Sequence, residues 1–339
     1  MASESAPDGA PTSTTTDPGS GGIPVPSPDT AAPADAQDWP DVSVVIATRD
    51  RIELLRKAVD AALAQDYPGA IEVVVVFDRS EPVQELHRSD AKRRVRVIVN
   101  DRSPGLAGAR NSGILAAAGD LVAFCDDDDF WLPHKLRVQV EAMRRLNGVG
   151  AVAGIEIHYG DKVRYRVPET DRITVEALSR SRVTGAHPST YVFRRNLFLG
   201  NVGLVDEQLP HGYGEDYDVL MRMARAGTIA MVQLPLVVVL WHKGSYFSRR
   251  WEAMAEGVGY LLEKHPELGA DPRGRAWIEG QRAFALAALG QRREAVRGAR
   301  RALKANPREP RGVLALLVAA RVLPAHTVMN VLNARGRGI

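Results

Sequence analysis

Short apolar runs alternate with segments of helical periodicity in the first half of the chain, and this alternation constrains the fold most. The apolar runs are 42–47, 71–77, 95–99 and 121–125. Val, Ile, Ala, Leu and Phe dominate them, as expected of strands buried on both faces. Strands joined through helices lie parallel and follow right-handed crossovers. The sequence therefore predicts an α/β fold with a doubly wound, mostly parallel sheet.

The stretch Gly105–Trp131 carries the strongest functional signal. It predicts a helix over 107–118 and a strand that runs into four consecutive aspartates, Asp126–Asp129. Adjacent carboxylates repel one another, so solvent or a cation must neutralise them. Inner strands of α/β sheets bind ligands at their carboxyl ends, and Mg²⁺ is held by one or two carboxylates plus substrate phosphates. We therefore expect a metal–diphosphate site here, with an acidic surface turn as the alternative.

Local signals give the limits of several elements. Asp50 is expected to cap the helix after the first strand, with Glu53 as its capping-box partner. Pro133 is expected to open the helix that follows the aspartates. A later helix begins at Glu215-Asp216-Tyr217-Asp218 and runs through Ala226. Acidic residues in a first helical turn are stabilised by the helix dipole, which explains this cluster without a catalytic role.

Composition argues against several classes of protein. The 339 residues carry a net charge of +3 and show no basic stripe interleaved with aromatic residues, so no nucleic-acid partner is expected. No segment approaches the ~20 apolar residues of a transmembrane helix. The N-terminus lacks the basic and apolar regions of a signal peptide. The single cysteine, Cys125, lies in an apolar strand and is expected to be a core residue. These features predict a cytoplasmic protein.

Changes in composition and residue pattern divide the chain into three parts. Residues 1–38 are rich in Pro, Ser, Thr, Ala and Gly and bury too little apolar surface to offset their ordering entropy, which predicts a disordered tail. Residues 39–248 form the α/β domain, and 249–339 form a small all-α domain. Within the latter, 276–307 matches the spacing of one tetratricopeptide unit. One repeat cannot stand alone, so we expect these helices to pack on the α/β domain, on the side where Trp241-His242 leaves the sheet.

Seven motifs occur in one order along residues 41–245, and together they resemble family 2 glycosyltransferases of the GT-A fold. They are VSVVIATRDR (42–51), VVVVFD (73–78), GLAGARNSGI (105–114), GDLVAFCDDDDFW (119–131), PSTYVFRR (188–195), GEDYDVLMRMARAG (214–227) and WH (241–242). Each is weak singly, but seven in the correct order form a strong signal. The resemblance implies a GT-A α/β domain that binds a nucleotide-sugar donor and transfers its sugar to an acceptor.

The resemblance also implies roles on the donor side. Ala47, Thr48 and Arg49 would line the nucleotide pocket, and Asp78 would hydrogen-bond the base. Arg110 would lie on the donor side as well.

A second set of implied roles concerns the metal and the acceptor. Asp126-Asp127-Asp128 would be the DxD-type motif, with Asp126 facing ribose and metal and Asp128 binding Mg²⁺ or Mn²⁺ directly. Asp127 and Asp129 are either supporting members or solvated. His242 is either a further contact to the metal or diphosphate, or a structural histidine. Asp216 would be the general base that deprotonates the acceptor hydroxyl.

These roles predict a single, inverting sugar transfer. One carboxylate on the far side from the metal suits one in-line displacement. Processive members carry a Gln-x-x-Arg-Trp motif, whereas Phe247 takes the place of Gln before Arg250-Trp251. UDP-sugars are the family's usual donors, and its acceptors are saccharides, lipid-linked saccharides, peptides or small metabolites.

Other classes of function stay open. A nucleotidyltransferase would share the sheet but needs a glycine-rich phosphate loop, which Thr48–Arg51 does not provide. A non-catalytic scaffold could act through protein contacts of the C-terminal helices, yet it would need neither acidic motif. Val313–Val318, between Arg311 and Arg321, could rest on the inner face of an anionic membrane as a peripheral contact. Ordinary helical core is the preferred explanation for that segment.

Overall fold

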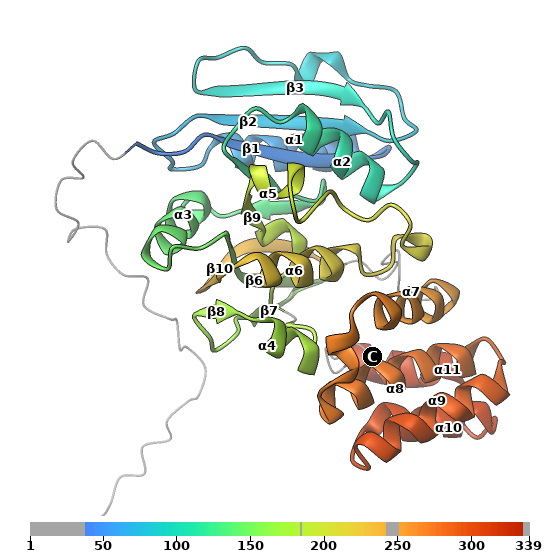
Figure 1. The fold of residues 1–339 in the computed structure, drawn as a ribbon. Coiled ribbons are helices and arrows are strands. Elements are labelled where there is room, and N and C mark those ends of the chain that lie inside the picture. Colours follow the sequence, from blue (N-terminus) through green and yellow to red (C-terminus); the bar gives the residue numbers. More distant parts are fainter. Residues whose placement is uncertain (1–37, 184, 242–250, 335–339) are drawn as a thin grey trace, which may run out of the picture. The chain divides into compact units, whose positions relative to one another are not determined.

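The computed structural model describes residues 38–183, 185–241 and 251–334 (Figure 1). Nearly all of the predicted tail 1–38, together with His242, therefore lies outside the described residues. The described residues from Trp39 onward pack as one compact unit. No helix in the described ranges combines the length and apolar character needed to cross a membrane.

Among the described residues, ten strands form one mixed sheet in the order β3-β2-β1-β4-β9-β6-β10-β5, with β7 on β6 and β8 on β10. Strands β3, β2, β1 and β4 are parallel, as are β6 and β10, whereas β9 and β5 run antiparallel to their neighbours. The predicted α/β fold is confirmed. The strands are β1 (Val42–Thr48), β2 (Ile71–Phe77), β3 (Arg93–Val99), β4 (Leu121–Phe124), β5 (Asp129–Trp131), β6 (Gly150–Tyr159), β7 (Lys162–Arg166), β8 (Arg172–Ile173), β9 (Val192–Arg194) and β10 (Ile229–Leu240).

Helices cover both faces of the sheet because successive side chains of each strand point to opposite faces. Val44 and Ile46 belong to the core that includes α1 (Ile52–Leu63) and α3 (Lys135–Arg145). Val45 belongs to the core that includes α2 (Leu106–Ala116) and α6 (Glu215–Ala226). Helix α2 lies so close to β1 that a Cβ on Gly113 would sit 2.3 Å from Val45 Cγ1, so only glycine fits there.

The C-terminal helices, orange to red in Figure 1, pack on the side of the molecule that carries α6. Helices α8 and α9 form the pair expected over 276–307, with Ala283 against Gly298 where they meet. The tetratricopeptide assignment itself stays a prediction. The remaining helices are α4 (Val175–Arg180), α5 (Arg195–Leu199), α7 (Trp251–Lys264), α8 (Pro272–Ala288), α9 (Arg292–Ala305), α10 (Pro310–Ala319) and α11 (Ala325–Ala334), with the short 3₁₀ helices η1 (Gln84–Leu86), η2 (Pro188–Thr190), η3 (Pro210–Gly212) and η4 (Pro266–Gly269).

Two local predictions were wrong. Arg51, not Asp50, precedes the first turn of α1, and its side chain makes no capping hydrogen bond. Asp50 has a φ of 56°, a left-handed conformation that turns the chain before the helix begins. Helix α3 begins at Lys135 and not at Pro133, because the chain first makes a turn, in which the Lys135 N–H donates to the Leu132 carbonyl oxygen at 3.1 Å.

Candidate active site

The aspartate run lies where β4 ends, and its four side chains alternate in exposure. Asp127 and Asp129 are buried, whereas Asp126 and Asp128 are partly exposed. The alternative that Asp127 and Asp129 are simply solvated is therefore wrong. Asp129 starts β5 and pairs with Val239 of β10, so the run connects two strands of the sheet. Between the two strands the chain makes a turn, which the hydrogen bond from the Asp129 N–H to the Asp126 carbonyl oxygen closes at 3.1 Å.

One side of the run is held by the segment that follows β1. Thr48 Oγ1 donates a hydrogen bond to Asp127 Oδ2 at 2.7 Å. The half-exposed guanidinium of Arg51 pairs with Asp127 and also with Asp128. Burial raises the pKa of Asp127 to about 6, although Thr48 and Arg51 oppose that rise. These contacts hold Asp127 in a buried position, next to the partly exposed Asp128.

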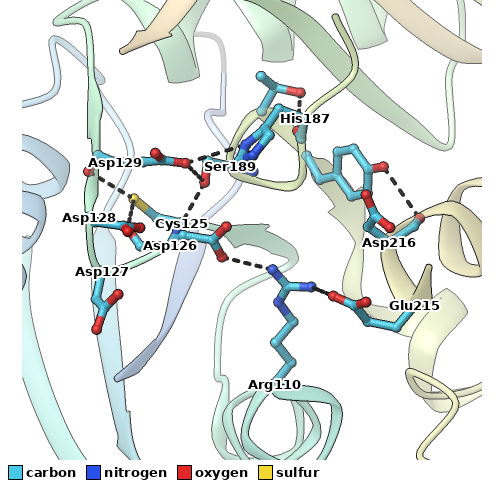
Figure 2. A network of polar contacts seen from close by, with 12 residues as sticks. Arg110, Cys125, Asp126, Asp127, Asp128, Asp129, His187, Ser189, Glu215 and Asp216 are labelled. Atoms are coloured by element: carbon cyan, nitrogen blue, oxygen red, sulfur yellow. Dashed lines mark hydrogen bonds and ion pairs between the residues drawn. The ribbon is translucent and has the colours of Figure 1, made fainter. Parts of the chain in front are cut away.

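The other side of the run approaches η2 (Figure 2). Ser189 Oγ accepts a hydrogen bond from the Asp126 backbone N–H at 2.9 Å and donates one to Asp129 Oδ2 at 2.5 Å. His187 Nδ1 lies 3.3 Å from the same Asp129 oxygen. Asp126, Asp129 and His187 each bring one potential ligand atom within 4.8 Å of the others. Burial and the nearby charge of Asp126 raise the pKa of Asp129 well above its ordinary value.

This donor set fits a divalent cation. Carboxylate oxygens suit Mg²⁺ and Mn²⁺, and an imidazole nitrogen is a common ligand for transition metals. Burial lowers the pKa of His187, and a metal binds the neutral imidazole. Asp126, Asp129 and His187 could therefore hold the ion. The predicted ligand Asp128 pairs with Arg51 on the other side of the run, and its metal role stays a prediction.

Arg110 joins the aspartate run to α6 (Figure 2). It projects from α2, is almost fully buried, and donates through separate nitrogens to Asp126 Oδ1 and Glu215 Oε1, both at 2.8 Å. A buried guanidinium between two carboxylates neutralises both and orients both. Arg110 therefore lies beside Asp126, on the side where the resemblance places the donor.

Glu215 and Asp216 open α6, but their environments differ. Burial and the charge of Asp216 raise the pKa of Glu215, and Arg110 only partly offsets this. Burial would also raise the pKa of Asp216, but Arg182, the backbone N–H of Tyr217 and the charge of Arg110 together outweigh burial and lower that pKa. Neighbouring carboxyls whose pKa values are driven apart can take different roles. The lowered pKa favours the ionised form of Asp216, which is the form that can accept a proton.

The predicted nucleotide-pocket residues lie at the carboxyl ends of β1 and β2. Ala47 and Thr48 are the last two residues of β1, and the Thr48 hydroxyl already donates its hydrogen bond to Asp127. The exposed Arg49 lies 3.7 Å from the Asp50 carboxylate. Asp78 follows β2, and its carboxylate accepts hydrogen bonds from Asn100 Nδ2 at 2.8 Å and the Gly105 N–H at 3.0 Å. Asp78 thus shapes the start of α2, and its contact to a base stays a prediction.

Several residues of the site were not predicted from the sequence. Arg51, Arg182, His187 and Ser189 reach it from loops or segment ends, and Glu215 was noted only for its place in the first turn of α6. A signal existed for two of them, because Arg51 and Ser189 lie inside the quoted motifs at 42–51 and 188–195. His187 and Arg182 lie outside every motif.

Comparison with known proteins supports the resemblance. Residues 43–200, just under half of the chain, match the model of Glycosyl transferase family 2. The succinoglycan biosynthesis protein ExoO of Rhizobium meliloti is 41% identical over 103 residues, which are 30% of this chain and 29% of that protein. An Escherichia coli protein, UDP-Glc:alpha-D-GlcNAc-diphosphoundecaprenol beta-1,3-glucosyltransferase WfgD, is 27% identical over 106 residues, 31% of this chain and 42% of that one. This chain thus covers less than half the length of either relative.

A solved structure supports the fold over a longer range. Residues 1–349 of TarS from S. aureus, solved in complex with UDP-GlcNAc, give a TM-score of 0.56 at 18% identity, over 88% of this chain and 92% of that one. A match over 88% of this chain is longer than the α/β part, so it must also include C-terminal helices. The predicted GT-A fold with an added helical part is confirmed, and the match of residues 43–200 to the family 2 glycosyltransferase model agrees with it.

Proposed function

We propose that this chain is an inverting, non-processive glycosyltransferase that moves one sugar from a nucleotide-diphosphate donor to an acceptor hydroxyl. One observation carries the proposal. Arg110 connects Asp126, on the side where metal and diphosphate are expected, to Glu215, which is next to Asp216. This contact supports a reaction in which the proposed leaving-group site and the proposed proton acceptor act together. Inversion, metal dependence and the identity of the donor are parts of the proposal.

Each residue of the network takes one part of the reaction. Asp216 accepts the proton of the acceptor hydroxyl as it attacks the anomeric carbon. Asp126 and Asp128, or Asp126 with Asp129 and His187, would hold Mg²⁺ or Mn²⁺. That ion, when bound, supplies positive charge for the departing nucleoside diphosphate. Arg110 keeps Asp126 and Glu215 at fixed positions, and Thr48 with Arg51 holds Asp127 beneath them.

The relatives support a choice of substrates. The name of WfgD gives UDP-glucose as its donor and a diphosphoundecaprenol-linked GlcNAc as its acceptor, and TarS was solved with UDP-GlcNAc. We propose a UDP-sugar donor and, among the acceptor classes, a lipid-linked saccharide. The test is a screen of UDP-, GDP- and dTDP-sugars against such acceptors in the presence of Mn²⁺, with release of nucleoside diphosphate as the signal. Release without a UDP-sugar preference would contradict the donor choice, and no transfer with any donor would contradict the function.

Replacing Arg182 with Met is expected to shift the pH dependence of the reaction. The ion pair with Arg182 is the largest of the interactions that lower the pKa of Asp216, and its loss should raise that pKa because burial opposes ionisation. A base works only when ionised, so the acidic limb of kcat/KM should move to higher pH by about 1 to 3 units. The measurement is a pH–rate profile of the two proteins. Arg182→Lys keeps the charge and should hold the limb in place, and an unchanged limb in Arg182→Met would argue against Asp216 as the base.

A further inference from the structure

The C-terminal segment contacts α6 through a buried carboxylate that the proposed reaction does not use. Asp218 lies two residues after Asp216 and is fully buried. Its Oδ1 accepts from Lys264 Nζ at 2.7 Å and lies 2.9 Å from His265 Nε2. Its Oδ2 accepts from Nε and one terminal nitrogen of Arg222, at 3.0 and 2.8 Å. These four contacts, from three residues, use the full acceptor capacity of a carboxylate.

Lys264 extends this network to the segment before α6. Its Nζ also donates to Asp206 Oδ2 at 2.5 Å, and Tyr260 of the same helix donates to that oxygen at 2.8 Å. Arg222 in turn donates to the Val202 carbonyl at 2.6 Å. The end of α7, the loop at 202–206 and the first turn of α6 are thus joined by charged hydrogen bonds, most of them shielded from water.

Helix α7 also packs directly on the turn that leads into α6. Gly214 has a φ of 86°, and a Cβ there would lie 2.8 Å from Leu261 Cδ1. A Cβ on Gly257 would lie 2.8 Å from the Tyr213 carbonyl oxygen. The backbone of this turn presents Glu215 and Asp216. A displacement of α7 would therefore change the position of both carboxylates.

We propose that Lys264 is a positioning residue for Asp216, so that the C-terminal helices are part of the working catalytic unit and not a separable module. The inference rests on the proposed function, because it takes Asp216 as the base. Lys264 acts through Asp218, which anchors the first turn of α6 to α7. Displacing a reacting group by about 1 Å can reduce the rate about 10²-fold. Loss of the contact between Lys264 and Asp218 should therefore lower kcat more than it lowers the affinity for the donor.

The test is Lys264→Met in the full chain. It removes the charge and keeps a similar side-chain length. We expect kcat to fall about 10- to 100-fold and the donor KM to stay within about twofold, since the donor site is built from other elements. Hydrogen exchange measured without substrate should be faster over residues 213–222. Lys264→Arg should restore most of kcat, because a guanidinium can also bridge Asp206 and Asp218.

Arg301→Met is the matched control. Arg301 forms an ion pair of similar quality with Glu279, through two contacts of 2.9 Å, wholly within the C-terminal helices. The Arg301→Met variant should have a lower melting temperature, but its kcat and its hydrogen exchange over residues 213–222 should not change. If Lys264→Met does not fold, His265→Gln takes its place in the comparison.

The outcomes separate this inference from the proposed function. If the wild-type chain transfers sugar but Lys264→Met matches Arg301→Met in both kcat and exchange, the positioning role is refuted and the function stands. If the wild-type chain transfers no sugar, the proposed function fails and the positioning role falls with it. A loss of kcat together with faster exchange over 213–222, reversed in Lys264→Arg, supports the positioning role.

Discussion

Sugar transfer is expected to fall at least about 10³-fold when Asp126 is replaced by Asn or when a chelator removes divalent cations. The departing diphosphate gains negative charge, and a bound cation supplies several kcal/mol of stabilisation, with each ~1.4 kcal/mol worth a factor of ten. The measurement is the initial rate of transfer before chelation, after it, and after Mn²⁺ or Mg²⁺ is restored. Full activity in the chelated protein would exclude a metal role for the aspartate run.

Two further variants decide which residues hold the ion. Asp128→Asn removes the predicted DxD ligand, whereas His187→Gln removes a member of the group that the fold brings together with Asp126 and Asp129. Mn²⁺ affinity can be measured by the paramagnetic signal of the free ion, without any turnover. The ligand whose loss weakens Mn²⁺ binding is the correct one. Asp66→Asn, an exposed carboxylate paired with Arg137 at 2.9 Å, is the control and should bind Mn²⁺ normally.

Asp216→Asn is expected to lower kcat about 10²- to 10⁴-fold, the range that general-base catalysis usually contributes. Asparagine keeps the shape of the side chain but cannot accept the acceptor's proton at neutral pH. The aspartate run is untouched, so binding of UDP, measured calorimetrically, should change less than about twofold. Loss of UDP affinity with unchanged turnover would show instead that the acidic first turn serves only the helix dipole.

The variant Glu215→Gln tests which of the two carboxyl groups in this turn, Glu215 or Asp216, acts as the base. Glu215 faces Arg110, and its raised pKa makes it a weaker candidate for the ionised base at neutral pH. Glutamine can still accept from Arg110, so kcat should fall less than in Asp216→Asn. The reverse order of effects would assign the base to Glu215.

The local sequence was sufficient to predict the first four strands, the position of the aspartate run and the start of α6, whereas the short strands β5 and β8 were not predicted. Each of the predicted features depends on neighbours in sequence. Apolar runs such as Ile71–Phe77 form strands buried on both faces, and helical spacing after Gly105 forms α2. Asp126 and Asp216 were both identified because each lies at an element end that a short motif marks. The capping prediction at Asp50 was wrong because the tertiary turn into α1 outweighed a local preference.

Only the tertiary structure decided which side chains share the site. Arg110 and Glu215 are 105 positions apart, and the stacking of α2 and α6 on one face of the sheet brings them to 2.8 Å. Asp218 meets Lys264 for a similar reason, since α7 folds back on the turn before α6. Pairing across such separations depends on how the sheet orders its strands and how helices pack on it. A side chain's pattern in the sequence specifies its local element and its face, whereas its charge partner is set by the packing of elements that are distant in the chain.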